Sequence, residues 1–66
     1  MNNITTARER MGVSQEQLAN RLGVSRQTVY RWEKGKTNPP KSAIYMMADL
    51  FGCSTDYLVV RTDERN

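Results

Sequence analysis

Side chains that can bind an anion are concentrated in one short stretch of the 66-residue sequence, VSRQTVYRWEKGK, at residues 24–36. If this stretch is a helix with about 100° per residue, Val29 and Trp32 fall on one side, and the polar residues share an arc of about 140°. A face that serves only solubility would more often mix Glu with Lys. We therefore interpret the arc as a surface that meets an anionic partner. It contains no acidic residue and is formed by Arg26, Gln27, Tyr30, Arg31 and Lys34.

The chemistry of these side chains favours double-stranded DNA as the partner. Arginine can donate two hydrogen bonds to O6 and N7 of guanine, and glutamine can bond N6 and N7 of adenine in the same bidentate way. The major groove of DNA displays these atoms and admits an α-helix, whereas the deep, narrow groove of duplex RNA excludes one. Phosphate contacts are expected from side chains around this helix, namely Gln15, Ser25, Lys34, Lys36 and Lys41.

Glycine and serine residues divide the chain into helices and predict an all-α fold. Each glycine follows a stretch with helical apolar spacing, where a left-handed C-terminal cap is favoured: Gly12, Gly23, Gly35 and Gly52. Serines in N-cap positions follow three of these glycines, at Ser14, Ser25 and Ser54, and Gln17 can complete a capping box with the first serine. Five helices are predicted, at residues 3–11, 15–22, 26–34, 41–51 and 55–60.

The connection GVS between the second and third helices is short enough to require a steep crossing with a small contact point. Ala19 lies one turn before this connection, where a larger side chain would hold the two helices apart. Val29 and Trp32 are expected to face back toward Leu18 and Leu22. The core positions expected on the other helices are Ile4, Ala7, Met11, Ile44, Met47, Ala48, Phe51, Tyr57 and Leu58.

Length and charge indicate one small cytoplasmic domain with an acidic partner. Residues 1–60 are expected to form the domain and residues 61–66 a polar C-terminal tail. The net charge is +3, and the positive excess lies before residue 53, where eight Lys or Arg face four acids. No apolar run approaches the roughly 20 residues that span a bilayer, and the N-terminus lacks the apolar segment of a signal peptide.

Other classes of function find little support in the sequence. It has no His, no glycine-rich phosphate loop and no metal-ligand cluster, so we expect no enzymatic activity, cofactor, metal or small-molecule ligand. The single Cys53 excludes an internal disulfide. A protein-interaction module is the other alternative, in the form of an antitoxin that also binds its own operator. The few residues after Val60 offer little length for a toxin-binding segment.

At residues 15–34, the sequence QEQLANRLGVSRQTVYRWEK resembles the helix-turn-helix of the lambda-repressor-like family, also called the Xre or Cro type. The resemblance extends over about residues 4–60 and includes EKGKTNPP, MADLFG and CSTDYL. It implies a five-helix domain that inserts its third helix into the major groove, commonly as a dimer on palindromic DNA. The expected function is that of a transcriptional regulator, in particular a repressor. By family position, the base-reading residues are Arg26, Gln27 and Arg31, with Tyr30 as an additional contact and Gln15 as a phosphate anchor.

Two further expectations concern contacts made by the protein itself. Glu33 lies at the edge of the basic arc, where it is either an exposed helix acid or a structural partner. The resemblance implies the second, because an acid at this position pairs in the family with an arginine that corresponds to Arg8. Val59 and Val60 extend the apolar run YLVV beyond what the core needs, so they either end a helix that docks on the domain or face a second copy of the chain. We favour the second interpretation, a homodimer interface that forms mainly on DNA, with Tyr57, Leu58, Val59 and Val60.

Overall fold

The computed structural model describes residues 2–60, which form five helices and contain no strand. The helices are α1 (Ile4–Arg10), α2 (Gln15–Leu22), α3 (Arg26–Lys34), α4 (Lys41–Phe51) and α5 (Thr55–Val59). The predicted all-α, five-helix fold is therefore confirmed. None of these helices is long and apolar enough to cross a membrane. Met1 and the predicted polar tail at residues 61–66 lie outside the described part of the chain.

Capping chemistry sets the ends of the helices. Ser14 Oγ accepts a hydrogen bond from the Gln17 N–H at 3.0 Å, and Gln17 Oε1 accepts one from the Ser14 N–H at 2.9 Å, which is the predicted capping box. Gly23 ends α2 with a φ of 73°, a conformation that glycine adopts without steric cost. The ends of α2, α3 and α4 agree with the prediction, whereas α1 is one residue shorter at each end and α5 stops at Val59.

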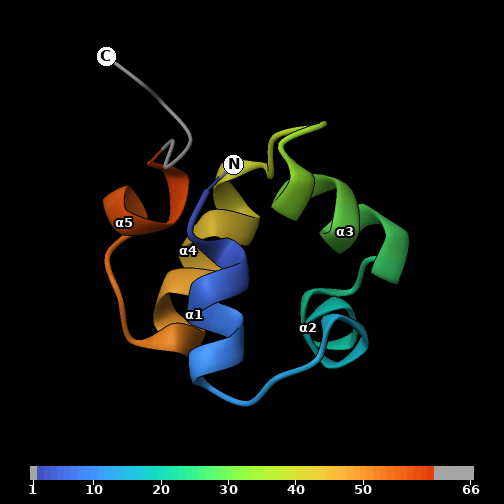
Figure 1. Cartoon of the computed structure of the whole chain (residues 1–66), viewed down its shortest axis with the longest axis horizontal. Helices are drawn as coiled ribbons and strands as arrows, with labels where there is room; N and C mark the ends of the chain where they lie inside the picture. The colour runs from blue at the N-terminus through green and yellow to red at the C-terminus, as the bar shows by residue number, and fades with distance from the viewer. Residues whose placement is uncertain (1, 61–66) are drawn as a thin grey trace.

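The helix-turn-helix lies at one end of the molecule and the last helix at the other. In Figure 1, α2 and α3 are at the right, α5 is at the left, and α1 and α4 lie between them. Within the turn, the Val24 N–H donates to the Ala19 carbonyl at 3.0 Å. Ala19 is buried next to this turn, so its small side chain allows the close approach of α2 and α3 that the short connection requires.

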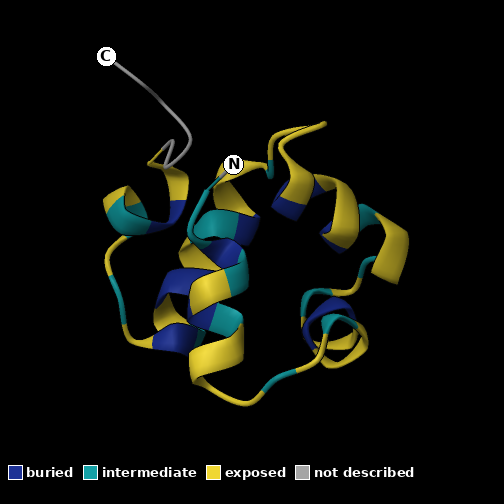
Figure 2. Cartoon of the chain, in the orientation of Figure 1, coloured by how far each residue is buried: buried dark blue, intermediate teal, exposed yellow. Residues whose placement is uncertain are grey.

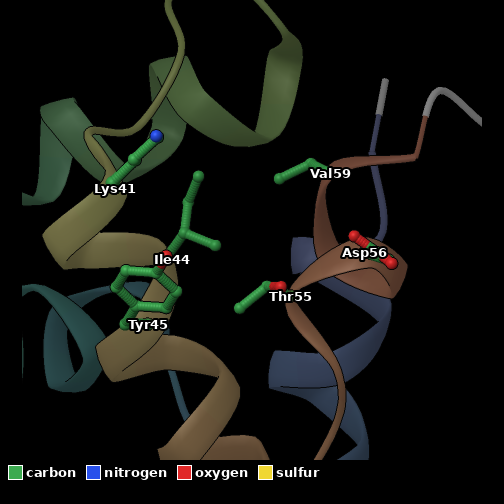
Figure 3. Close-up of a pocket in the computed structure, with 6 residues that line it drawn as sticks. All are labelled: Lys41, Ile44, Tyr45, Thr55, Asp56 and Val59. Atoms are coloured by element: carbon green, nitrogen blue, oxygen red, sulfur yellow. The ribbon is translucent and has the colours of Figure 1, made fainter.

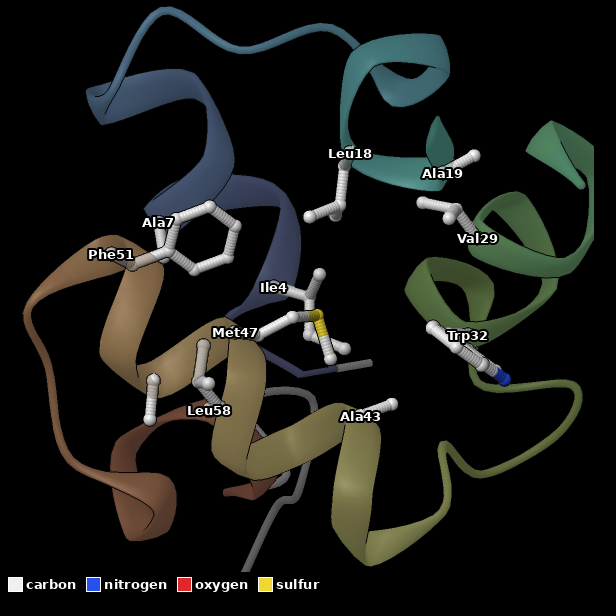
Figure 4. Packing of buried hydrophobic residues seen from close by; sticks show 11 residues of the cluster. Ile4, Ala7, Leu18, Ala19, Val29, Trp32, Ala43, Met47, Phe51 and Leu58 are labelled. Carbon is white, nitrogen blue, oxygen red and sulfur yellow. The ribbon is translucent and has the colours of Figure 1, made fainter. Parts of the chain in front are cut away.

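Every helix contributes one fully enclosed side chain to a single core. These side chains are Ile4, Leu18, Val29, Met47 and Leu58 (Figure 4). Around them pack six further buried apolar residues, which are Ala7, Ala19, Trp32, Ala43, Ala48 and Phe51. Colouring by burial shows the resulting division of each helix into an inner and an outer face (Figure 2). The helical periodicity thus identified most of the core.

Some expected core positions are more exposed than the periodicity indicated. Met11 was expected on the buried face of α1 but is 51% exposed, because α1 ends at Arg10 and the chain turns away from the core. Ile44 is only half-buried on α4, since it lines a hollow between α4 and α5. Leu22 and Tyr57 are half-buried and pack against the edge of the core.

Two asparagines before α1 connect this helix to the ends of α3 and α5. The Asn2 side-chain amide donates to the Trp32 carbonyl of α3 at 2.8 Å. The Asn3 side-chain amide donates to the Tyr57 carbonyl of α5 at 2.7 Å, and the Asn3 backbone N–H donates to the Leu58 carbonyl at 3.3 Å. The start of the described chain thereby satisfies carbonyl groups near two helix C-termini.

Candidate nucleic-acid interface

Helix α3 is fixed to the domain by its inner face and its N-cap. Val29 is fully buried, and Trp32 is 4% exposed. Ser25 Oγ accepts a hydrogen bond from the Thr28 N–H at 3.2 Å and lies 2.9 Å from Thr28 Oγ1. These contacts set the rotation of α3, and hence which of its side chains face outward.

The outer face of α3 carries the polar residues that the sequence placed together. All five are exposed, namely Arg26, Gln27, Tyr30, Arg31 and Lys34. Tyr30 and Lys34 interact with each other, because Lys34 Nζ lies 5.6 Å from the centroid of the Tyr30 ring. This cation–π contact restrains two flexible side chains while leaving the tyrosine 41% exposed. The face therefore combines positive charge with donors and acceptors that suit base edges.

Glu33 is the only acidic residue of α3, and it points inward. It is 4% exposed, and Arg8 Nε of α1 donates to its Oε2 at 2.6 Å. A second, longer bond joins Arg8 Nη2 to Oε1 at 3.4 Å. Arg8 and Glu33 thus form the pair that the family resemblance implies. The exposed-acid alternative is excluded, and the outer face of α3 carries no negative charge.

Gln15 at the start of α2 also reaches this carboxylate. Its side-chain Nε2 donates to Glu33 Oε1 at 2.9 Å, while Arg8 Nη1 donates to the Val13 carbonyl at 2.8 Å. Glu33 consequently joins α1, α2 and α3 at one point. From the sequence, Gln15 was expected only to contact a DNA phosphate, and its hydrogen bond to Glu33 was not predicted. No local pattern indicates it, since the two residues are 18 positions apart.

The other predicted phosphate contacts lie around the ends of α3 and at the start of α4. Ser25 caps α3 and is exposed, so its hydroxyl is accessible beside the first turn. Lys34 and Lys36 are exposed at the end of α3, where the Lys36 N–H donates to the Arg31 carbonyl at 2.9 Å. Lys41 is exposed at the start of α4 and lines the hollow that α4 forms with α5.

The four residues expected at a dimer interface separate into core and surface positions. Leu58 is fully buried and belongs to the core, so it offers no surface to a partner. Tyr57 is half-buried. Val59 and Val60 are 45% and 52% exposed and form an apolar surface at the end of α5.

Residues 2–60 hold no group of three or more His, Cys, Asp or Glu side chains suited to a metal ion. Cys53 packs against the edge of the core. Burial raises the pKa of the Cys53 thiol, and the nearby Arg10 guanidinium opposes this with a smaller effect. The thiolate, which is the reactive form, is therefore disfavoured.

Comparison with known proteins identifies the family. A family model described as "Helix-turn-helix" matches residues 4–58. An HTH-type transcriptional regulator of Archaeoglobus fulgidus is 39% identical over 57 residues, which cover 86% of this chain and 81% of that protein. One from Methanocaldococcus jannaschii is 38% identical over 52 residues, covering 79% of each chain. One from Sinorhizobium fredii is 36% identical over 62 residues, covering 94% of this chain and 80% of that protein.

The fold and the exposed face of α3 define a helix-turn-helix DNA-binding domain. The chain belongs to the lambda-repressor-like (Xre-type) family of helix-turn-helix transcriptional regulators. Its general function is therefore regulation of transcription through DNA binding.

The buried ion pair leads to a stability prediction. Arg8→Met or Glu33→Met should each lower the free energy of unfolding by about 3–5 kcal/mol, because each leaves one charge buried without its partner. The double variant should lose less than the sum of the two. Urea unfolding of the four proteins in a double-mutant cycle measures the coupling. Arg10→Met, at an exposed position two residues away, serves as the control and should change little. Additive effects at Arg8 and Glu33 would contradict the pairing.

Proposed function

We propose that the protein is a sequence-specific repressor that binds a palindromic operator in double-stranded DNA as a homodimer. In this proposal α3 enters the major groove, where Arg26, Gln27, Tyr30 and Arg31 contact base edges. Phosphates are contacted by Gln15, Ser25, Lys34, Lys36 and Lys41. Because its partner is DNA, we place the protein in the cytoplasm, and we assign it no enzymatic activity.

One observation carries this proposal, namely the inward orientation of Glu33. An acid on the outside of α3 would repel the phosphates that line the groove. Its burial against Arg8 leaves an outer face on which every charged side chain is positive. The side chains expected at base edges are exposed and project from a regular helix whose inner face is held in the core. They can therefore enter the groove without rearrangement of the core.

A homodimer is supported by the surface at α4 and α5. A hollow of about 160 Å³ lies between these helices, lined by Lys41, Ile44, Tyr45, Thr55, Asp56 and Val59 (Figure 3). Beside its apolar wall stand one exposed cation, Lys41, and one exposed anion, Asp56. In a two-fold symmetric interface, a contact between Lys41 of one copy and Asp56 of the other would form twice, because each residue pair is repeated about the axis. Val59 lines this hollow, and the next residue, Val60, is also exposed.

Repression follows from occupancy of the operator. One helix reads only a few base pairs, and a symmetric pair of helices reads two half-sites about one helical turn apart. A dimer bound across both half-sites excludes other proteins from that stretch of DNA. Transcription in vitro from a promoter that overlaps the operator tests this step, since a repressor lowers transcript yield and an activator raises it.

Specific and salt-dependent binding is the first expected outcome. Selection of bound duplexes from random DNA should yield a palindromic sequence. For that sequence the logarithm of affinity should fall linearly with the logarithm of salt concentration, because phosphate contacts by Lys and Arg release counterions. Fluorescence anisotropy over a salt series measures the slope. A flat salt response, or selection without enrichment of any sequence, would reject the proposed function.

Substitutions on and beside α3 should separate base contacts from phosphate contacts. Arg26→Ala, Gln27→Ala and Arg31→Ala should each cost on the order of 1–3 kcal/mol on the selected operator and relax the preference at defined base pairs. Lys36→Ala should weaken binding to all sequences alike, because a phosphate contact carries no base information. Affinities for single-base variants of the operator give both results. If Lys36→Ala changed base preference while the α3 variants did not, the assignment of the face would be wrong.

The dimer proposal is tested at Val60. Val60→Asp should leave the fold intact, because Val60 is 52% exposed, and should abolish cooperative occupancy of the two half-sites. Met11→Asp is the matched control, since Met11 is 51% exposed, and it should leave cooperativity unchanged. Binding curves on operators with one or two half-sites measure the effect, and circular dichroism checks the fold. Full cooperativity in folded Val60→Asp would place the interface elsewhere.

A further inference from the structure

Two consecutive asparagines at the start of the described chain bond to two helices that are far apart in sequence. In Figure 1 this segment lies between α5 at the left and α3 at the right. The Asn2 amide donates to the Trp32 carbonyl of α3 at 2.8 Å, and the Asn3 amide donates to the Tyr57 carbonyl of α5 at 2.7 Å. Because the α-carbons of neighbouring residues are only about 3.8 Å apart, this short piece of backbone links the two helices.

Both asparagines are also held firmly on α1. Asn2 Oδ1 accepts a hydrogen bond from the Ile4 N–H at 3.0 Å, and the Asn3 carbonyl accepts one from the Ala7 N–H at 3.0 Å. The Asn3 N–H donates in addition to the Leu58 carbonyl at 3.3 Å. Since Ile4 and Ala7 are buried in the core, the ends of α3 and α5 are bonded to one fixed point at the start of α1.

The placement of α3 relative to α5 has a consequence in the proposed homodimer. There, the exposed Val59 and Val60 at the end of α5 face the second copy, and α3 reads one half-site. The separation and rotation of the two reading helices therefore depend on where α3 lies relative to α5 in each copy. One extra base pair between the half-sites moves the second half-site by about 3.4 Å and rotates it by about 35°. A dimer whose α3 and α5 are firmly linked cannot follow this change without breaking contacts.

We propose that Asn2 and Asn3 are positioning residues that determine which spacing of half-sites the dimer accepts. The proposal rests on the DNA-binding function and the α5 dimer proposed above. In it, the hydrogen bonds of the two side chains make it costly to move α3 relative to α5, so that an operator with the wrong spacing binds less tightly. The free energy of the hydrogen bonds that must break limits how large this discrimination can be.

The experiment compares operators that carry the selected spacing with operators that are one base pair longer or shorter. The spacing ratio is the affinity for the selected spacing divided by the affinity for the changed spacing. Asn3→Ala removes the donor to the Tyr57 carbonyl, and Asn2→Asp removes the donor to Trp32 while keeping an oxygen for the Ile4 N–H. Each variant should lower the spacing ratio about fivefold, which is the order of effect of one net hydrogen bond.

A duplex with a single half-site separates this effect from a general loss of binding. Asn3→Ala should leave affinity for the single half-site nearly unchanged, because the contacts of α3 with the bases are kept. The added charge of Asn2→Asp weakens binding to every duplex alike and cancels from the spacing ratio. Asn20→Ala is the matched control, since Asn20 is exposed on α2, and it should keep the spacing ratio of the wild type.

Thermal melts identify a temperature at which all variants are folded. Should Asn3→Ala unfold, Asn3→Asp makes the same test, because aspartate also suits the N-cap position that Asn3 occupies before α1. An unchanged spacing ratio in folded Asn2 and Asn3 variants, or a loss confined to the single half-site, would overturn the inference and leave the proposed function intact. A wild-type dimer that binds all spacings equally would do the same. A wild-type protein that shows no cooperativity at any spacing would overturn the proposed homodimer and the inference together.

Discussion

The arrangement of this domain depends on the burial of one carboxylate. Removing a charged group from water costs several kcal/mol unless partners replace its hydration. Glu33 receives donors from Arg8 at 2.6 Å and from Gln15 at 2.9 Å, and Arg8 extends the network to the Val13 carbonyl. Because these partners come from α1, α2 and the connection between them, the carboxylate is satisfied only when the helices are correctly placed. The network therefore specifies the orientation of α3 as well as its attachment.

The burial of Glu33 also determines the sign of the charge on the outer face of α3. Helix α3 has only nine residues. Within them it carries an apolar face that packs in the core, a buried acid paired with Arg8, and an exposed polar face. Val29 and Trp32 supply the apolar contacts, Glu33 supplies the polar contact, and the remaining arc is left to Arg, Gln, Tyr and Lys. A carboxylate that rotated outward would both leave Arg8 unpaired and reduce the positive potential of α3. Stability and recognition are thus linked through a single side chain.

Features governed by neighbours in sequence could be predicted, and features governed by distant residues could not. The capping box of Ser14 and the left-handed Gly23 act within one turn, so the ends of α2 followed from local chemistry. The exposure of Met11 could not be predicted in this way, because the apolar periodicity of α1 does not reveal that the helix ends at Arg10, one residue earlier. Leu58 was expected both in the core and at the dimer interface, and the choice between the two depends on how α5 lies against the core, which buries it fully.

The candidate site shows the same division between local and distant information. The exposed arc of α3 follows from helical spacing alone, since each residue's angle around the axis is fixed by its position. The pair of Arg8 and Glu33 could be anticipated only from family resemblance, because 25 positions separate them. The contact of Gln15 with Glu33 was not anticipated, although Gln15 had been assigned to the DNA backbone. A residue type suited to phosphate is equally suited to a carboxylate, and only the folded chain shows that this amide lies 2.9 Å from Glu33 Oε1.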